Sequence, residues 1–343
     1  MRLLNTLYVT EHQTRVTCDH RSLVVSHEAI GRSRVPLEAL EAVVLLGHAQ
    51  VTSQALAACA KRRIRVASIQ SNGKLRFVVG GAVGGNVHLR LAQYRAAENR
   101  ERCVEVARWI VAGKLQNARA MLRRWAGDAH SGHLRRRLNR FESAIGERAS
   151  GVADVSSGDT IRGFEGEGAR IYFLGMRHHL RASECAMPFE TRTRRPPRDA
   201  VNAALSFAYG LLLSEVVGAI EAVGLDPQVG FLHGVRSGRP SLALDLLEEL
   251  RPSVADRFVV GLLTRQMVGE MDFVTRMGGA CYLSDGARRK FLDAWEGFKA
   301  AETRHRILNR LVPRGSLPLI QAIVLARHLR GDLPAYPPYV MDG

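Results

Sequence analysis

The amino-acid sequence predicts an α+β protein, with a small β-rich domain at residues 1–86 followed by a larger, all-helical domain at residues 87–343. Up to about residue 80, short β-branched or alternating segments are separated by polar turn residues, as is typical of strands. From Val87 onward, apolar residues recur with the period of a helix. Four glycines in GGAVGGN (80–86) lie between the two parts and indicate a flexible hinge.

The amino-terminal domain is expected to contain one helix, at 52–63, where Thr52 or Ser53 can cap the amino end. The turn SNG (71–73) predicts a hairpin between the last two strands. The glycines at 80–86 favour a hinge over a phosphate-binding loop, because no lysine followed by Ser or Thr continues the motif. Strands are expected at LLNTLYVT (3–10), TRVTCD (14–19), SLVVSH (22–27), AVVLLG (42–47), IRVASI (64–69) and KLRFVV (74–79).

Composition favours a cytoplasmic protein that binds nucleic acid. The chain has 49 Lys and Arg against 33 Asp and Glu, a net charge of +16, which indicates a polyanionic partner, either nucleic acid or an anionic membrane. No membrane association is expected: we see no signal peptide, and the longest apolar stretch, 200–225, contains Glu215 and Glu221, which favours a buried helix. Five scattered cysteines without a CxxC pair indicate reduced thiols.

The stretch FLHGVRSGRPSLALDLLEELRP (231–252) places a histidine before a short acidic helix, which prolines should confine to 240–251. On a helical wheel the leucines form one stripe, and Asp245, Glu248 and Glu249 fall on the opposite side. The simplest interpretation is an amphipathic helix with a solvated acidic face. In so basic a protein, the acids could instead pair with arginines or hold a cation. His233 ends an apolar segment, as a buried core histidine would.

A second acidic spot lies in GFEGEGARIYF (163–173), where Glu165 and Glu167 stand between glycines that let a ligand approach closely. The simpler interpretation is a turn before a helix, with Glu165 near its positive amino end. Together with His233 and a carboxylate of the acidic helix, Glu165 would make a mixed oxygen and nitrogen set. Carboxylates suit Mg²⁺ and an added imidazole favours Mn²⁺. Such a site in a basic cleft suits phosphodiester chemistry.

Three segments in this order, FEGEGARIYF, RRPPRDAVNAALSFAYGLLLSE and the stretch 231–252, resemble the CRISPR-associated spacer-acquisition endonuclease and integrase family, the universal CRISPR adaptation subunit. The resemblance extends to VHLRLAQY (87–94) and GKLQNARAMLRR (113–124) and leans toward a type I system. It implies a metal-dependent endodeoxyribonuclease with a dimerising β domain and a catalytic helical domain. It also implies a homodimer that joins a small second CRISPR adaptation subunit. The reaction implied is insertion of short foreign DNA fragments into the CRISPR array, by attack of a 3′-hydroxyl on a phosphodiester.

The resemblance also implies which residues form the site. The family's catalytic, metal-binding residues fall on Glu165, His233 and Glu248, with Mg²⁺ or Mn²⁺ as cofactor. Supporting positions fall on Asp245, beside the metal, on Asn202 in the RPP–N motif, and on Arg170. The sequence departs from the family at Glu167–Gly168, where many relatives have a small or amide residue followed by alanine, so Glu167 stays an alternative ligand to Glu165.

Arginine clusters provide candidate contacts to double-stranded DNA, because the guanidinium fork binds phosphate strongly and without regard to sequence. Each cluster could also be an ordinary solvated helix face. RRRLNR (135–140) is one such cluster, and His178 and His179 are expected to contact DNA or solvent. The candidate DNA-binding residues are Arg177, Arg181, Arg192, Arg194, Arg195 and Arg198.

The sequence therefore predicts a metal-dependent DNA endonuclease and integrase of CRISPR adaptive immunity. Two alternatives remain. One is a DNA-binding scaffold without catalytic activity, against which the intact set of two acids and a histidine argues. The other is a general metal-dependent nuclease acting on DNA or RNA and unrelated to spacer capture.

Overall fold

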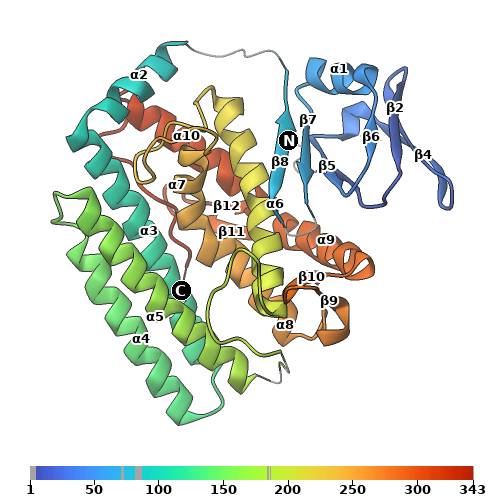
Figure 1. Cartoon of the computed structure of the whole chain (residues 1–343). Coiled ribbons are helices and arrows are strands. Elements are labelled where there is room, and N and C mark those ends of the chain that lie inside the picture. Colours follow the sequence, from blue (N-terminus) through green and yellow to red (C-terminus); the bar gives the residue numbers. More distant parts are fainter. Residues whose placement is uncertain (1–4, 71–72, 82–86, 184, 186, 343) are drawn as a thin grey trace.

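Two four-stranded sheets, one α-helix and a short 3₁₀ helix (Leu37–Ala39) form the described amino-terminal part of the computed structural model (Figure 1). The structure describes residues 5–70, 73–81, 87–183, 185 and 187–342. The first sheet has the order β1 (Thr6–Val9), β5 (Ala42–Leu46), β7 (Arg65–Ile69) and β8 (Leu75–Val79), with only the last pair antiparallel. The second has the order β4 (Gly31–Pro36), β3 (Ser22–His27), β2 (Arg15–Asp19) and β6 (Gln50–Val51). Helix α1 (Ser53–Lys61) lies between β6 and β7 in the chain.

Strand β5 is buried on both faces. Val43 and Leu45 belong to the small core of the amino-terminal part. Val44 and Leu46 belong to the large core of the helical part. Because successive side chains of a strand point to opposite faces, the uninterrupted apolar run AVVLL suits a sheet that is covered by its own domain on one side and by helices on the other.

The six strands predicted in this part are confirmed, and so is the helix cap: Thr52 Oγ1 accepts the backbone N–H of Ala55 at 3.3 Å. Strand β4, GRSRVP, was not predicted, because five of its six residues are polar, charged, Gly or Pro and it lies largely exposed at the outer position of its sheet. The predicted hairpin of β7 and β8 is also confirmed. Residues 71–72 of its turn and residues 82–86 of the predicted hinge lie outside the described residues.

The rest of the described chain is mostly helical. In Figure 1, α3, α4 and α5 lie side by side, and α6 and α7 lie nearer the centre of the molecule. The helices are α2 (Val87–Glu98), α3 (Arg100–Gly127), α4 (Gly132–Gly151), α5 (Gly158–Ala182), α6 (Ala200–Val223), α7 (Ser241–Leu250), α8 (Arg257–Thr264), α9 (Asp285–Ala300) and α10 (Leu317–Leu329).

The α+β class is confirmed, but the expectation of an all-helical carboxy-terminal domain is wrong in one respect. Two antiparallel hairpins lie among the helices: β9 (Phe273–Arg276) with β10 (Ala280–Leu283), and β11 (Glu302–His305) with β12 (Arg310–Pro313). The first turns through Gly278 and Gly279, whose φ angles of 85° and 74° suit glycine. Strands of four residues are too short to show alternation clearly within a helical sequence.

Helix α6 is the apolar stretch of the sequence and forms the centre of the large core. By length and composition it could cross a membrane, with a mean hydropathy of 1.7, but 72% of that window is buried inside the protein. The amino-terminal part docks against it, since Arg65 Nη1 donates to the carbonyl oxygen of Ser214 at 2.8 Å. Tyr8 also donates to Glu296 Oε1 of α9 at 2.6 Å. Direct contacts therefore join the two parts.

Candidate active site

The predicted acidic helix is α7, and it lies in the interior. It packs against α3, α6 and α10, so the side opposite its leucines also faces protein. Asp245, Glu248 and Glu249 are 0%, 3% and 0% exposed. The interpretation of a solvated acidic face is therefore wrong, because helices surround α7. Buried carboxylates require partners, and each of the three has its own set.

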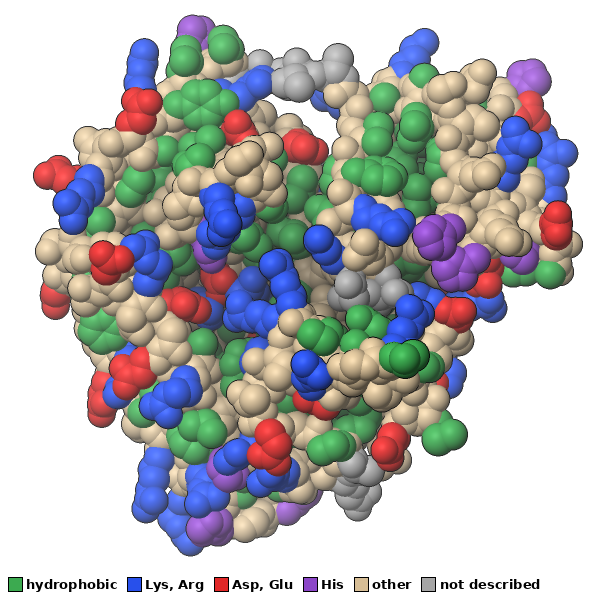
Figure 2. All heavy atoms as spheres, viewed as in Figure 1, with side chains coloured by type: hydrophobic (Ala, Val, Ile, Leu, Met, Phe, Trp, Pro, Cys, Tyr) green, Lys and Arg blue, Asp and Glu red, His purple; other side chains and the backbone are tan. Residues whose placement is uncertain are grey.

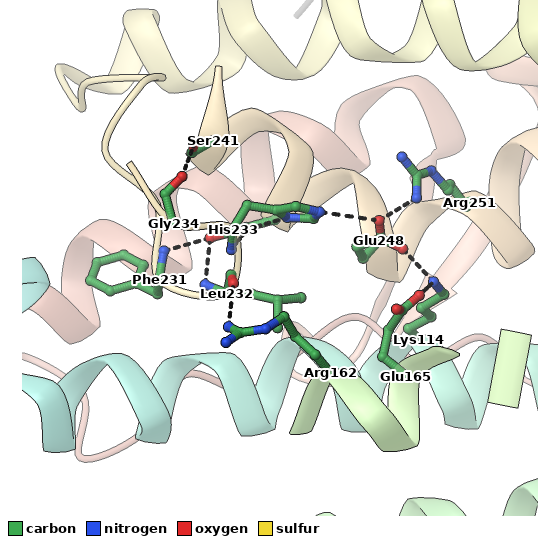
Figure 3. A network of polar contacts seen from close by, with 11 residues as sticks. Lys114, Arg162, Glu165, Phe231, Leu232, His233, Gly234, Ser241, Glu248 and Arg251 are labelled. Atoms are coloured by element: carbon green, nitrogen blue, oxygen red, sulfur yellow. Dashed lines mark hydrogen bonds and ion pairs between the residues drawn. The ribbon is translucent and has the colours of Figure 1, made fainter. Parts of the chain in front are cut away.

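Asp245 holds the segment that carries His233, and Figure 3 shows the His233 ring pointing toward Glu248. Its Oδ2 accepts the backbone N–H groups of Phe231 at 2.6 Å and Leu232 at 3.0 Å, and its Oδ1 accepts that of His233 at 2.9 Å. Oδ1 also lies 2.7 Å from His233 Nδ1. An ionised carboxylate only accepts hydrogen bonds, so Nδ1 carries a ring proton, and in the neutral imidazole the lone pair is then on Nε2. This Nε2 lies 4.0 Å from Glu248 Oε1.

The loop before His233 approaches the first turn of α7 closely at Gly230. A Cβ at this position would lie 2.7 Å from Asp245 Oδ2 and 2.7 Å from the carbonyl carbon of Ser241. Further along the loop, Ser241 Oγ donates to the carbonyl oxygen of Gly234 at 3.0 Å. A residue with a side chain at 230 would therefore displace either Asp245 or the start of α7.

Glu248 and Glu165 converge on one ammonium group. Lys114, on α3, donates to Glu165 of α5 and to Glu248 Oε2 of α7, the latter at 2.5 Å. Arg251 reaches Glu248 Oε1 from another side (Figure 3). Burial alone would raise the pKa of Glu248, but Arg251 and Lys114 outweigh it and hold that pKa at about 2. Glu248 is therefore ionised at neutral pH.

Glu165 lies inside a helix, which the interpretation as a turn did not foresee. Helix α5 begins at Gly158, and the glycines of FEGEG are all helical. Glu167 lies on a different side of α5 and pairs with Arg148 of α4 at 2.7 Å. Arg148 in turn lowers the pKa of Glu167, against a smaller opposing effect of burial. The structure thus brings Glu165, and not Glu167, to Glu248.

Glu249 has no part in this convergence and instead binds the carboxy-terminal segment. It accepts hydrogen bonds from Tyr336 Oη at 2.6 Å, Gln321 Nε2 at 3.1 Å and the backbone N–H of Tyr339 at 3.0 Å. Burial raises its pKa to about 7, and the three donors only partly offset that. Glu249 therefore ties the end of the chain to the helix that carries Glu248.

Glu165, Glu248 and His233 have the types of side chain that bind a divalent cation. Two carboxylates and an imidazole with a free Nε2 are ligands that Mg²⁺ and Mn²⁺ accept, and a cationic ammonium already lies between the carboxylates. In the present arrangement, no group of three or more His, Cys, Asp or Glu among the described residues is placed to hold a metal ion. The residues therefore fit a metal by type, and Lys114 holds the position between the two carboxylates.

Asn202 supports a loop and not the carboxylates. Its side chain accepts hydrogen bonds from Arg192 Nη1 at 2.8 Å and from the backbone N–H of Thr193 at 2.9 Å. It donates to the carbonyl oxygen of Thr191 at 2.8 Å and to Asp199 Oδ2 at 2.6 Å. Asn202 thus fixes the loop 191–199 against the start of α6.

The candidate DNA-binding arginines fall into two groups. Arg177 and Arg181 both pair with Glu190, and Arg192 is held by Asn202. Arg198 donates to the carbonyl oxygen of Gly278 in the first carboxy-terminal hairpin, at 2.9 Å. The side chains of Arg194 and Arg195 lie exposed at the surface, as do those of Arg181 and Arg198 despite their contacts.

Arg170 is also exposed, and its charge lowers the pKa of Glu167 after the larger effect of Arg148. The structure therefore places Arg170 on the Glu167 side of α5. His178 and His179 are more enclosed than expected. His179 stacks on Trp125 with ring centroids 5.0 Å apart, and burial lowers its pKa to about 4. His178 stacks on Phe141 with centroids 5.8 Å apart.

Lys114 and Arg251 are the two site residues that sequence reasoning did not select. A signal for Lys114 exists, because it is the single charged residue in the apolar stretch WIVAGKL, where a lysine on a buried helix needs an acidic partner. Arg251 follows Glu248 by three residues, a spacing at which side chains on a helix meet.

The whole chain is similar to known proteins of one family. Residues 7–297 match the family model described as CRISPR associated protein Cas1. The chain is 39% identical over 338 residues to CRISPR-associated endonuclease Cas1 1 of Moorella thermoacetica, with 98% of each chain covered. It is 41% identical over 342 residues to CRISPR-associated endonuclease Cas1 2 of Rhodospirillum rubrum, again with 98% of each covered.

Two solved structures show the same fold. A CAS1 protein from Thermotoga maritima superposes with a TM-score of 0.77 at 22% identity and 99% coverage of both chains. A casposase bound to its integration product superposes with a TM-score of 0.84 at 22% identity, covering 97% of this chain and 93% of that one.

Proposed function

The chain belongs to the family of CRISPR-associated protein Cas1, and we propose that its endonuclease and integrase chemistry takes place where Glu165, His233 and Glu248 meet. The observation that supports this assignment is the convergence of the two carboxylates, from α5 and α7, on the single ammonium of Lys114. His233 stands beside them, with Nε2 4.0 Å from Glu248 Oε1. Glu167 lies apart, paired with Arg148.

The cofactor of this site is Mg²⁺ or Mn²⁺, held by Glu165, His233 and Glu248. Bound there, a divalent ion activates a hydroxyl group or water and stabilises charge on the leaving oxygen. The protein's own groups prepare the ligands: Asp245 keeps the proton of His233 on Nδ1, and Arg251 holds one oxygen of Glu248. Such supporting contacts orient a ligand and tune its basicity.

The substrate is double-stranded DNA, and the reaction is insertion of short DNA fragments into a CRISPR array by a 3′-hydroxyl. The net charge of +16 supports a polyanionic substrate. Lysine and arginine side chains are spread over the face shown in Figure 2 and gather near its centre. Arg194 and Arg195, which are exposed, are the strongest candidates for phosphate contacts.

The active form is a homodimer that joins a small second CRISPR adaptation subunit, with the β-rich part at 1–86 making the dimer. Strand β4 lies at the outer position of its sheet and is largely exposed, as an edge that needs covering would be. Light scattering at micromolar concentration should show a dimer. A monomer with full integration activity would contradict this part of the proposal.

The test of the site compares Glu165→Gln, His233→Ala and Glu248→Gln with Glu167→Ala as the matched control on the same helix. We expect the three ligand variants to lose Mn²⁺- or Mg²⁺-dependent cleavage and strand transfer by orders of magnitude. Binding of duplex DNA should persist. Glu167→Ala should stay within about tenfold of the parent, the mild end of outer-contact effects. If Glu167→Ala abolishes activity and Glu165→Gln does not, the assignment of the ligand is wrong.

A further inference from the structure

Lys114 is a buried lysine whose described hydrogen bonds both go to proposed metal ligands. Its side chain is 9% exposed, and Nζ donates to Glu165 and to Glu248. Burying an ammonium is unfavourable unless acidic groups compensate it. Two facing carboxylates are equally unfavourable without a cation between them. The buried ammonium of Lys114 therefore requires the two carboxylates, and the two carboxylates require the ammonium to stay close together.

We propose that Lys114 is a place-holding cation, which keeps Glu165 and Glu248 together in the metal-free protein and gives up its position when Mg²⁺ or Mn²⁺ binds. This inference rests on the proposed assignment of these two glutamates as metal ligands. It goes beyond that assignment, because it makes a residue of α3 set how tightly the metal binds.

The two cations at Glu248 differ in how firmly each is held. Arg251 contacts Glu248 Oε1 and also lies over the ring of Tyr209, with its guanidinium carbon 5.1 Å from the ring centroid. Its position is therefore fixed from two directions. Lys114 has a flexible four-carbon side chain with a rotatable ammonium group. Between the two, Lys114 is the cation that can leave.

The structure also offers the ammonium a place to withdraw to. Lys114 lines a small cavity of about 20 Å³ together with Tyr209, Asp256, Arg194 and Arg251. A cavity needs roughly 10–15 Å³ to hold a water molecule, and an ammonium group is of similar size. Asp256, which accepts the hydroxyl of Tyr209 at 2.6 Å, provides an acidic partner there. The wall of this cavity thus carries a carboxylate and a phenol that are not among the present acceptors of Lys114.

Lys299 supplies a matched control elsewhere in the same chain. It is 1% exposed and, like Lys114, bridges two glutamates, with Nζ 2.8 Å from Glu215 Oε1 and 2.8 Å from Glu296 Oε1. It differs in lying away from the proposed metal ligands. Removing either ammonium leaves two acids facing each other, but only at Lys114 should a metal ion take the vacant position.

The experiment measures thermal unfolding and Mn²⁺ binding by calorimetry for the full-length parent, Lys114→Met and Lys299→Met. In EDTA, both variants should melt below the parent. Added Mn²⁺ should restore the melting temperature of Lys114→Met and not that of Lys299→Met, because ligand binding stabilises the folded state. The Mn²⁺ affinity of Lys114→Met should be about tenfold higher than that of the parent. An affinity equal to or lower than the parent's overturns the inference.

Glu165→Gln, measured in the same way, separates this inference from the proposed function. If Glu165→Gln binds Mn²⁺ as the parent does, the metal site itself is wrongly assigned. If it loses Mn²⁺ while Lys114→Met gains no affinity, only the role of Lys114 is refuted. If Lys114→Met does not fold without metal, Mn²⁺ must recover soluble, folded protein, and failure to recover it also refutes the role.

Discussion

Replacing Asp245 by Asn changes the charge and the hydrogen-bonding pattern of this residue but hardly its shape. The carboxylate accepts three backbone N–H groups and lies against the ring Nδ1 of His233. An amide has one oxygen, which accepts hydrogen bonds, and one NH₂ group, which donates them. In Asp245→Asn the NH₂ group therefore points at hydrogen-bond donors, either on the side of Phe231 and Leu232 or on the side of His233. With the NH₂ on the side of His233, it can donate to Nδ1 only if the ring proton moves to Nε2. The lone pair that faces Glu248 is then lost.

The size of the effect follows from these contacts. Asp245 is 0% exposed, so the backbone N–H of His233 that faces the amide NH₂ stays buried and unsatisfied. That loss, together with the loss of charge-assisted bonds, costs about 3 kcal/mol. For a chain of 343 residues this lowers the melting temperature by about 4 °C. Metal affinity and activity should fall by about 10- to 100-fold, as when the partner of a ligating histidine is removed.

The assay combines thermal unfolding, Mn²⁺ titration and cleavage of duplex DNA. Asp332→Asn is the control, because Asp332 is 41% exposed and pairs only at the surface, with Arg330. It should change none of the three measurements appreciably. Parent-like Mn²⁺ affinity and activity in Asp245→Asn would refute the argument that Asp245 sets the tautomer of His233.

Three further results are expected. Changing Arg194 and Arg195 together to Ala should weaken duplex binding and reduce the slope of log affinity against log salt by about 1.8, which filter binding at several salt concentrations can measure. Glu249→Gln should flatten the pH dependence of stability between about pH 4.5 and 7, measured by urea unfolding. The pKa of Glu249 is raised from 4.5 to about 7 in the folded state, so its stabilising contribution is fully present below pH 4.5 and is lost as pH rises to 7. Gly230→Ala should lower stability by about 1–3 kcal/mol and reduce cleavage, because its Cβ would lie 2.7 Å from Asp245 Oδ2.

The arginine prediction has a control within the candidates themselves. Arg177 and Arg181 share Glu190 as a partner, so their charge is partly neutralised before any DNA arrives. Changing these two to Ala should alter the salt slope less than changing Arg194 and Arg195. An equal or larger change would place the DNA on the α5 side of the loop.

The general architecture could be predicted because its signals are local. Strands of alternating or β-branched residues, the Thr52 cap and the apolar period of the helices are each visible within a few residues. The short hairpin at 273–283 lacks such a signal. Strand β4 shows that packing at a sheet edge can recruit a polar segment, GRSRVP, that sequence pattern does not favour.

Only part of the candidate site could be predicted from the sequence, because the acids of α7 are buried. The wheel of α7 grouped the three acids on one side, but Glu249 follows Leu242 by seven residues and therefore lies near that leucine, away from Glu248. Nor could the wheel show that α3 and α10 pack against this helix. Once buried, each acid needs its own partner, and those partners come from distant parts of the chain. Lys114 precedes Glu248 by 134 residues and Tyr336 follows Glu249 by 87. No local pattern reports such pairings.

The chain after α7 shows how the fold uses a local irregularity at the site. Pro252 was expected to end the helix near Arg251, and α7 does end at Leu250. The chain then continues as a wider π-helical turn, Arg251–Asp256, before α8. Proline lacks the N–H that a regular helix needs, and π turns of this kind are frequent at functional sites. Here the π turn places Arg251 against Glu248 and Asp256 beside Tyr209. The same irregularity therefore positions Arg251, the fixed cation at Glu248, and Asp256, the acid that lines the cavity next to Lys114.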